Sequence, residues 1–393
     1  LSEGFEQSRK YKMIGAVEWE PSPVKELRNH LKNRWGIQDS EERVLQFDIQ
    51  RTEELFNGWK DKKFGESKGL DALVGNRQLD VIIGGPPCQA YSVAGRIRDE
   101  HGMREDYRNY LFESYLKVVQ HYKPRVFVFE NVPGILSAKP GDGSVRIIDL
   151  IQKAFADAGY AVLPDLSNAI IDMTEYGVPQ NRKRIIILGV SKEHYGDKAE
   201  AMVEKFYSSY LPEYKIEKKA TVRDAIGDLP KLRPLDEPIS YLGRKLSHSV
   251  SDPLINGHIS RFHNKRDIEL FKFLEEDIAS GRMKYTSAKS LKTLYTKLTG
   301  KTSNVHKYYV LRWDEPSNLI PAHLFKDGLR HIHPDPEQAR TITVREAARL
   351  QTFPDDYYFN CSQTDAFKMI GNAVPPLFAK KVAYAIYHLI QEN

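Results

Sequence analysis

The spacing of hydrophobic positions changes along this chain. Short apolar runs at residues 79–83, 125–129 and 185–189 have the length and β-branched character of buried strands. A similar run at residues 13–19 precedes them. Segments with helical spacing, such as residues 109–120, alternate with these runs. This alternation predicts an α/β domain with a doubly wound sheet over the first 190 residues.

The alternation stops after Val190. Residues 191 to about 320 are polar, with few long apolar runs. Within them, residues 267–277 have helical apolar spacing and are interpreted as scaffold. A terminal helix is predicted over residues 377–390. We therefore expect two domains, one of residues 1–190 plus 365–393 and a smaller one of residues 191–364.

A cysteine lies in the turn after the strand at residues 79–83. Residues 84–89 read Gly-Gly-Pro-Pro-Cys-Gln. Open α/β sheets carry their chemistry at the carboxyl ends of strands, so Cys88 is well placed to react. The prolines stiffen the turn, and the glycines let a ligand approach closely. The alternative is a buried structural cysteine beside a proline turn.

Three further motifs accompany this turn. Glu130-Asn131-Val132 ends the strand at 125–129, residues 180–184 (Gln-Asn-Arg-Lys-Arg) lead into the strand at 185–189, and residues 371–376 read Gly-Asn-Ala-Val-Pro-Pro. In this order the four motifs resemble the signature of the cytosine-5 DNA methyltransferases. The resemblance implies a Rossmann-like domain dependent on S-adenosylmethionine, a smaller target-recognition domain and double-stranded DNA as the partner.

The chemistry of that family explains the residue types. Carbon 5 of cytosine becomes nucleophilic only after a thiolate adds at carbon 6, and Cys88 would supply that thiolate. The resemblance implies that Glu130 acts as the acid at ring nitrogen 3. Arg184 would hold the cytosine carbonyl oxygen, with Arg182 beside it near Cys88 and the DNA backbone. The alternatives are a helix-capping carboxylate and a phosphate clamp without catalysis.

A base within a duplex must leave the stack before a thiol can reach it. The polar segment of residues 89–103 is interpreted as a mobile loop that closes over the flipped base. By resemblance, Gln89, Ser92 and Arg96 contact DNA. An ordinary solvated loop is the alternative.

The resemblance also assigns a cofactor site. Glu18, at a strand end, would bind the ribose of S-adenosylmethionine, and Trp19 would pack on the adenine. Asp48 would accept from the adenine amino group. The remaining positions that match the cofactor pocket are Ile49, Pro86, Leu111, Asn372 and Val374.

The chain departs from the family pattern at its start. The family carries a first strand and a glycine-rich turn before the position of Leu1, and neither is present. That strand lies in the middle of the sheet, so its loss would expose both neighbours. We therefore expect either an incomplete chain or a strand supplied by a separate chain, and cofactor binding depends on which holds.

Composition agrees with an intracellular nucleic-acid enzyme. The net charge is +5 with a pI near 8.8, which suits a DNA-binding groove on a balanced surface. Two cysteines and no apolar run of about 18 residues predict a reducing compartment and no membrane span. We expect a monomeric, metal-free protein of the prokaryotic cytoplasm, with any cognate restriction endonuclease acting separately.

Residues 191 to about 320, the middle region, occupy the place of the family's target-recognition domain. Its cations would bind phosphates, and the alternative is a charged, solvated insertion. After it, Thr343 and Glu346 predict a helix that begins with a capping box. The cations of the middle region are Lys215, Lys218, Lys219, Arg223, Lys231, Arg233, Arg244, Lys245, Arg261, Lys265 and Arg266.

Two rival functions remain open. The first is an RNA methyltransferase on the same fold. Relatives acting on transfer RNA carry a late Cys-Phe-Thr segment, where this chain has Cys361-Ser362-Gln363. The second is a DNA-binding protein without activity, suggested by the absent glycine-rich turn. The presence of Cys88, Glu130 and Arg184 argues against it.

Overall fold

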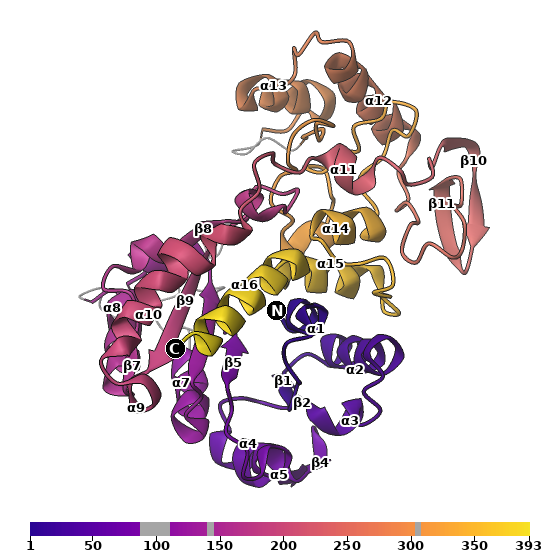
Figure 1. Cartoon of the computed structure of the whole chain (residues 1–393). Coiled ribbons are helices and arrows are strands. Elements are labelled where there is room, and N and C mark those ends of the chain that lie inside the picture. The colour runs from indigo at the N-terminus through magenta and orange to yellow at the C-terminus, as the bar shows by residue number, and fades with distance from the viewer. Residues whose placement is uncertain (87–110, 140–144, 303–307) are drawn as a thin grey trace. The chain divides into compact units, whose positions relative to one another are not determined.

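The computed structural model of the chain describes residues 1–86, 111–139, 145–302 and 308–393. By their contacts, the residues form two compact units (Figure 1). Unit 1 comprises Leu1–Tyr176, Lys183–Lys215 and Phe378–Asn393, and unit 2 comprises Gly177–Arg182 and Ile216–Leu377. Compared with the expected domains, residues 191–215 lie in unit 1, and residues 177–182 and 365–377 lie in unit 2.

Unit 1 is built around β-sheets. Its strands are β1 (Ala16–Glu18), β2 (Val44–Gln46), β3 (Trp59–Asp61), β4 (Gly65–Ser67), β5 (Val81–Gly84), β6 (Val126–Asn131), β7 (Tyr160–Ala161), β8 (Ile170–Asp172) and β9 (Lys183–Ser191). The largest sheet has the order β5–β6–β9–β7, and β8 also pairs with β9. β5 runs parallel to β6, whereas β9 is antiparallel to β6, β7 and β8.

The remaining strands of unit 1 form two small sheets. β1 pairs in parallel with β2, and β3 pairs with β4 as a hairpin. Within the described residues, β1 pairs only with β2 and β5 only with β6. The exposure of β5 agrees with its having one partner strand. Every residue of β5 is half-buried, whereas β6, which pairs on both sides, is buried except at Glu130.

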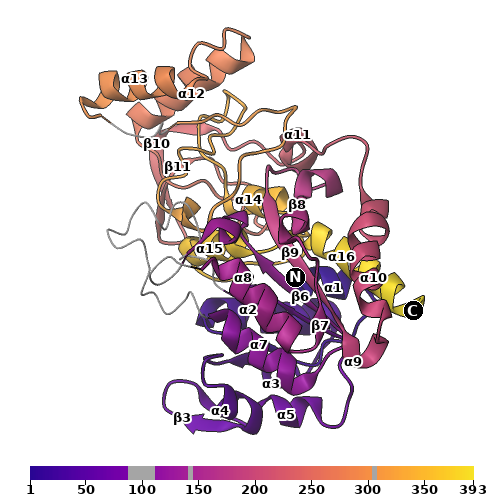
Figure 2. The ribbon, with the colours of Figure 1, turned by 90° about the vertical axis from the view of Figure 1, so that its left-hand side faces the viewer.

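Helices cover these sheets (Figure 2). Phe127 and Phe129 project from the same face of β6, and the rings of Tyr115 and Phe155 pack on both of them. The helices of unit 1 are α1 (Ser2–Ser8), α2 (Pro21–Trp35), α3 (Ser40–Arg43), α4 (Thr52–Asn57), α5 (Gly69–Val74), α7 (Leu111–Tyr122), α8 (Ile147–Asp157), α9 (Lys192–Tyr195), α10 (Lys198–Lys205) and nearly all of α16 (Pro376–Gln391). α7 and α8 therefore cover one face of the largest sheet.

Several expectations are confirmed in unit 1. Strands β5, β6 and β9 lie where the apolar runs predicted them, and α16 is the predicted terminal helix. α16 packs within unit 1, where the ammonium of Lys381 donates to the carbonyls of Tyr176 and Tyr214 at 2.8 and 2.9 Å. The α/β, doubly wound fold class is thus confirmed, with a sheet that is mixed rather than wholly parallel.

Unit 2 contains helices and one β-hairpin. The strands β10 (Pro234–Tyr241) and β11 (Arg244–His248) are antiparallel. The helices are α11 (Val222–Ile226), α12 (Lys265–Ala279), α13 (Ala288–Thr299), α14 (Val344–Leu350) and α15 (Gln363–Asn372). One apolar core lies around α11, α14 and α15, and a second joins α12 to α13. α12 confirms the helix expected around residues 267–277.

Among the described residues, no helix is long and apolar enough to cross a membrane. In the same residues, no group of three or more His, Cys, Asp or Glu side chains is arranged to hold a metal ion.

Candidate active site

The end of β5 lies against the end of β6. The two strands are parallel with Gly84 opposite Phe129, so the turn after β5 passes the side chain of Glu130. A Cβ atom on Gly85 would lie 2.8 Å from Oε2 of Glu130, a separation that only glycine permits without rearrangement. The side-chain amide of Asn131 also donates to the carbonyl of Pro86 at 3.4 Å. Glu130 and Asn131 therefore line the turn that leads to Cys88.

Glu130 forms an ion pair across the sheet. Nε of Arg184 lies 3.0 Å from Oε1 of Glu130, and each side chain is 12% exposed. β6 and β9 are antiparallel with Glu130 opposite Ile186, which brings Arg184 to the end of β6. The guanidinium of Arg184 also donates to the carbonyl of Lys183 at 2.8 Å. The sheet thus places an acid and a hydrogen-bond donor side by side, both within reach of solvent.

Arg182 has a different environment. Its side chain is 1% exposed and lies in unit 2. The guanidinium donates to the carbonyls of Gly371 and Ala373 at 3.2 and 2.9 Å, and to Ile320 at 3.5 Å. These bonds fix the backbone of the Gly-Asn-Ala-Val segment. The expected contact of Arg182 with a DNA phosphate stays a prediction. The burial of its side chain favours a role in holding the protein backbone of the Gly-Asn-Ala-Val segment.

The first two strands place acceptors together. The amide of Phe47 donates to the carbonyl of Glu18 at 3.1 Å, so the carboxyl ends of β1 and β2 lie side by side. Glu18 is half-buried, and burial raises its pKa. Asp48 follows directly and accepts from the amide of Gln50 at 3.0 Å. Two carboxylates at one sheet edge suit ribose hydroxyls and an amino group.

An aromatic ring stands beside these carboxylates. Trp19 is 45% exposed, its ring meets the edge of Phe64, and the ammonium of Lys63 lies 4.0 Å from the ring centre. An exposed indole at this edge can stack on a planar heterocycle. The two carboxylates and the exposed indole of unit 1 therefore fit the nucleoside part of S-adenosylmethionine.

The other expected cofactor residues divide between the units. Ile49 and Pro86 are half-buried, and Leu111 is buried in α7. Asn372 and Val374 belong to unit 2, where Asn372 is exposed and Val374 is buried. Cys88, Gln89, Ser92 and Arg96 lie outside the described residues.

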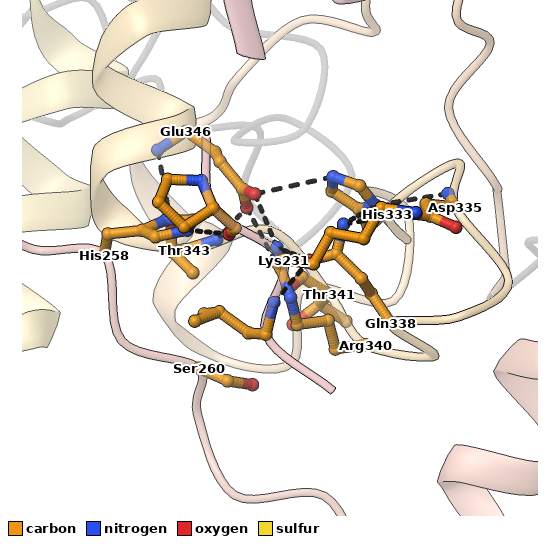
Figure 3. A network of polar contacts seen from close by, with 12 residues as sticks. Lys231, His258, Ser260, His333, Asp335, Gln338, Arg340, Thr341, Thr343 and Glu346 are labelled. Carbon is orange, nitrogen blue, oxygen red and sulfur yellow. Dashed lines mark hydrogen bonds and ion pairs between the residues drawn. The ribbon is translucent and has the colours of Figure 1, made fainter. Parts of the chain in front are cut away.

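Unit 2 holds a buried network of polar side chains (Figure 3). Arg340 and Glu346 are both fully buried, and two hydrogen bonds of 2.6 and 2.7 Å join them. The capping box is confirmed, because Thr343 and Glu346 bond each other's backbone amides. His333 lies 3.5 Å from the same carboxylate. The network joins the segment before α14 to the helix and has a structural role.

The cations of the middle region are mostly engaged by acids. Arg223 pairs with Asp314, and Arg233 with Glu337, at 3.1 and 2.8 Å. Arg261 is half-buried, and its guanidinium lies over the ring of Phe367 and donates to the carbonyls of Leu324 and Phe325 at 3.2 and 3.3 Å. Four other members of the expected set are also in ion pairs within their own unit, namely Lys215, Lys231, Lys265 and Arg266. The count of cations in the sequence therefore overstates the free positive charge.

Comparisons with known proteins agree with this geometry. The C-5 cytosine-specific DNA methylase family matches residues 2–388. The chain belongs to this family. It is 38% identical over 336 residues to the type II methyltransferase M.Bpa9945I of Bacillus paralicheniformis, covering 79% of this chain and 71% of that protein. Type II methyltransferase M.AgeI of Thalassovita gelatinovora is 32% identical over 386 residues, covering 83% and 86%.

A solved structure supports the fold of this DNA methylase. An Escherichia coli prophage protein described as a DNA modification methyltransferase aligns with a TM-score of 0.63 and 22% identity, covering 99% of this chain and 96% of that chain. This similarity extends over both units. DNA methyltransferases of this family use S-adenosylmethionine as the methyl donor.

Proposed function

We propose that this DNA methylase transfers a methyl group to carbon 5 of a cytosine flipped out of a specific duplex site. The observation that carries the proposal is the Glu130–Arg184 pair at the ends of β6 and β9. Ring nitrogen 3 and the carbonyl oxygen are neighbouring positions on cytosine. An acid and a guanidinium 3.0 Å apart match these two positions.

Each residue has a defined step. The thiolate of Cys88 forms a bond to carbon 6, while Glu130 donates a proton to nitrogen 3 and Arg184 binds the carbonyl oxygen. S-adenosylmethionine, when bound, supplies a methyl group on a sulfonium, and carbon 5 takes that group. A base then removes the proton from carbon 5, the thiolate leaves carbon 6, and nitrogen 3 returns its proton to Glu130.

The cofactor would lie against unit 1. Glu18 and Asp48 would accept from the ribose hydroxyls and the adenine amino group, and Trp19 would stack on adenine. Their juxtaposition at the ends of β1 and β2 supports this assignment. Unit 1 would then be the catalytic unit and unit 2 the target-recognition unit. Two relatives of the type II class favour a restriction–modification system or a solitary methylase, acting in the prokaryotic cytoplasm.

A methylation assay tests the proposal. Plasmid DNA from cells expressing the chain is bisulfite-sequenced, with Cys88→Ser as the matched inactive variant. We expect methylated cytosines in one fixed sequence context, and none with Cys88→Ser. Methylation that persists in Cys88→Ser would overturn the nucleophile. Methyl transfer to RNA alone, or DNA binding without transfer, would replace the proposed function by one of its two rivals.

A further inference from the structure

The charge of unit 2 is unevenly distributed between two adjacent helices. From Gly281 to Thr302 the chain carries six Lys or Arg residues and no Asp or Glu. α12, just before it, carries five acidic and three basic residues. α13 therefore has a polar surface of one sign, in a protein whose net charge is only +5.

The packing of α13 fixes which side faces solvent. Leu291 and Leu294 are buried in the core that they share with Leu270, Phe271 and Leu274 of α12. In both views α13 lies beside α12 and away from α14 and α15 (Figures 1 and 2). The buried side of α13 thus faces α12, and its opposite side is free to meet a partner.

Lysine and threonine occupy that opposite side. Lys289, Thr293, Thr296 and Lys297 recur at the three- and four-residue spacing of one helix face, and all four are exposed. Lys292, half-buried, stands at the margin of this face. The hydroxyl of Thr293 donates to the carbonyl of Lys289 at 3.0 Å, so the lysines and Thr296 are the donors of this face. Long flexible cations and a hydroxyl suit the phosphate oxygens of nucleic acid, which accept hydrogen bonds from Lys and Thr without regard to sequence.

These lysines differ from most of the cations of residues 215–266. In the described part of that region, Lys218, Lys219, Arg244 and Lys245 are also outside any ion pair, whereas six others are paired with acids. Within the described part of the chain, no ion pair engages Lys289, Lys292 or Lys297, whereas Arg223, Arg233 and others are held by acids. An unpaired lysine keeps its full charge for a phosphate, whereas a paired one must first give up its carboxylate. α13 gathers three such lysines on one helix of 12 residues, and this arrangement favours it as a phosphate-binding segment.

The helix is also held at both ends. The hydroxyl of Ser287 accepts from the amide of Ser290 at 3.0 Å, and Gly300 ends the helix in the left-handed conformation. A helix of 12 residues is about 18 Å long, enough to present several cations to one DNA backbone. Its cations are thereby held in a fixed arrangement before any partner binds.

We propose that α13 is a phosphate-binding helix through which the protein grips the backbone of double-stranded DNA. This inference rests on the proposed function, because it takes duplex DNA as the partner. The helix adds affinity without reading sequence, since Lys and Thr contacts to phosphates are alike at every base pair. Sequence choice then belongs to other parts of the protein.

Binding measured against salt tests the helix. The triple variant Lys289→Gln, Lys292→Gln, Lys297→Gln keeps helix-forming side chains and removes three charges. Fluorescence anisotropy with labelled duplex DNA is recorded from 50 to 200 mM KCl. We expect the slope of log K against log salt to fall by about 2 to 3, and the affinity at about 100 mM KCl to fall tenfold or more for target and unrelated duplexes alike.

A matched control separates a specific surface from net charge. Lys117→Gln, Lys198→Gln, Lys205→Gln removes the same charge from α7 and α10 of unit 1, and its slope should stay within about 1 of the parent. An unchanged slope in the α13 variant, or an equal fall in both variants, would overturn the α13 proposal. So would a loss seen with duplex RNA and not with duplex DNA.

The two proposals fail in different ways. A parent protein that binds duplex DNA, with a normal slope in the α13 variant, refutes the helix alone. A reduced slope without methyl transfer by the parent supports the helix and refutes the proposed reaction. A parent that does not bind duplex DNA refutes both.

Discussion

The two units each contain a glutamate–arginine pair, and the surroundings of the pairs differ. In unit 1, Glu130 and Arg184 meet at strand ends, each 12% exposed, beside the backbone of Gly85. In unit 2, Glu346 and Arg340 are both fully buried. The same two chemical groups are thus placed once at an accessible edge and once inside a core.

The bonding of each carboxylate follows from its place. Glu346 accepts two bonds from Arg340 and one from the amide of Thr343, with His333 at 3.5 Å. Burial opposes its ionisation, but the adjacent Arg340 outweighs burial, and the pKa of Glu346 lies well below its usual range. A buried carboxylate whose oxygens already accept these bonds cannot contact a substrate. Glu130, which solvent reaches, can, and this difference separates a structural pair from a reactive one.

The largest effect should come from Glu130→Gln. This change keeps the shape of the side chain but removes its acid, so turnover should fall by about 10² to 10⁴. Stability should fall by only about 1 kcal/mol, because the pair is partly exposed. Methyl transfer to duplex DNA and thermal unfolding are measured together, with Glu113→Gln on α7 as the control. Normal turnover in Glu130→Gln would show that the Glu130–Arg184 pair, like the Glu346–Arg340 pair, has only a structural role.

Glu346→Gln should give the reverse result. The change leaves the charge of Arg340 buried without its partner, which costs about 3 to 5 kcal/mol of unfolding free energy. Urea unfolding can be followed in unit 2 alone, because Trp313 is the one tryptophan of its sequence. Replacing Trp19, Trp35 and Trp59 by Phe isolates its signal. A loss below about 1 kcal/mol would show that the buried pair is dispensable.

Acidification should weaken unit 2 through its buried histidines. Burial lowers the pKa of His248 and His331 to about 4 and that of His263 and His333 to about 3. Below about pH 6.5 the unfolded chain binds protons that the folded unit does not, so stability falls with pH. The loss continues down to the folded pKa values, at about 1.4 kcal/mol per pH unit for each histidine.

The fluorescence of Trp313 again reports this change, because its ring contacts His333. The urea midpoint should fall steadily from pH 6.5 to pH 4. A midpoint that is level over this range would show that the histidines are solvated or protonated in the folded state. His333→Gln should reduce the pH slope and leave the direction unchanged.

Local signals in the sequence predicted much of the fold. Strands β5, β6 and β9, helix α16 and the capping box of Thr343 and Glu346 depend on residues close in the chain, so their patterns are visible there. The position of Glu130 at the end of β6 was predictable for the same reason. Its partner Arg184 was expected to bind the carbonyl oxygen of the flipped cytosine. The register of β6 and β9 brings the side chains of Glu130 and Arg184 together.

Charge was less predictable. The cations of residues 215–266 drew attention because they are numerous, yet six of them are paired with acids. Lys289, Lys292 and Lys297 lie outside that set, although the sequence between residues 281 and 302 contains no acidic residue. The sequence shows which charges exist, whereas pairing depends on distances of a few ångströms between distant residues.

The family, the order of the motifs and the elements that carry them could be predicted from the amino-acid sequence, because they depend on residue identity and short-range spacing. The burial of Arg182 against main-chain carbonyls, the enclosure of Arg340 and Glu346 in a core and the unpaired lysines of α13 are visible in the three-dimensional structure alone. These outcomes follow from burial and from the distance between opposite charges. Both arise when segments far apart in the chain are packed together.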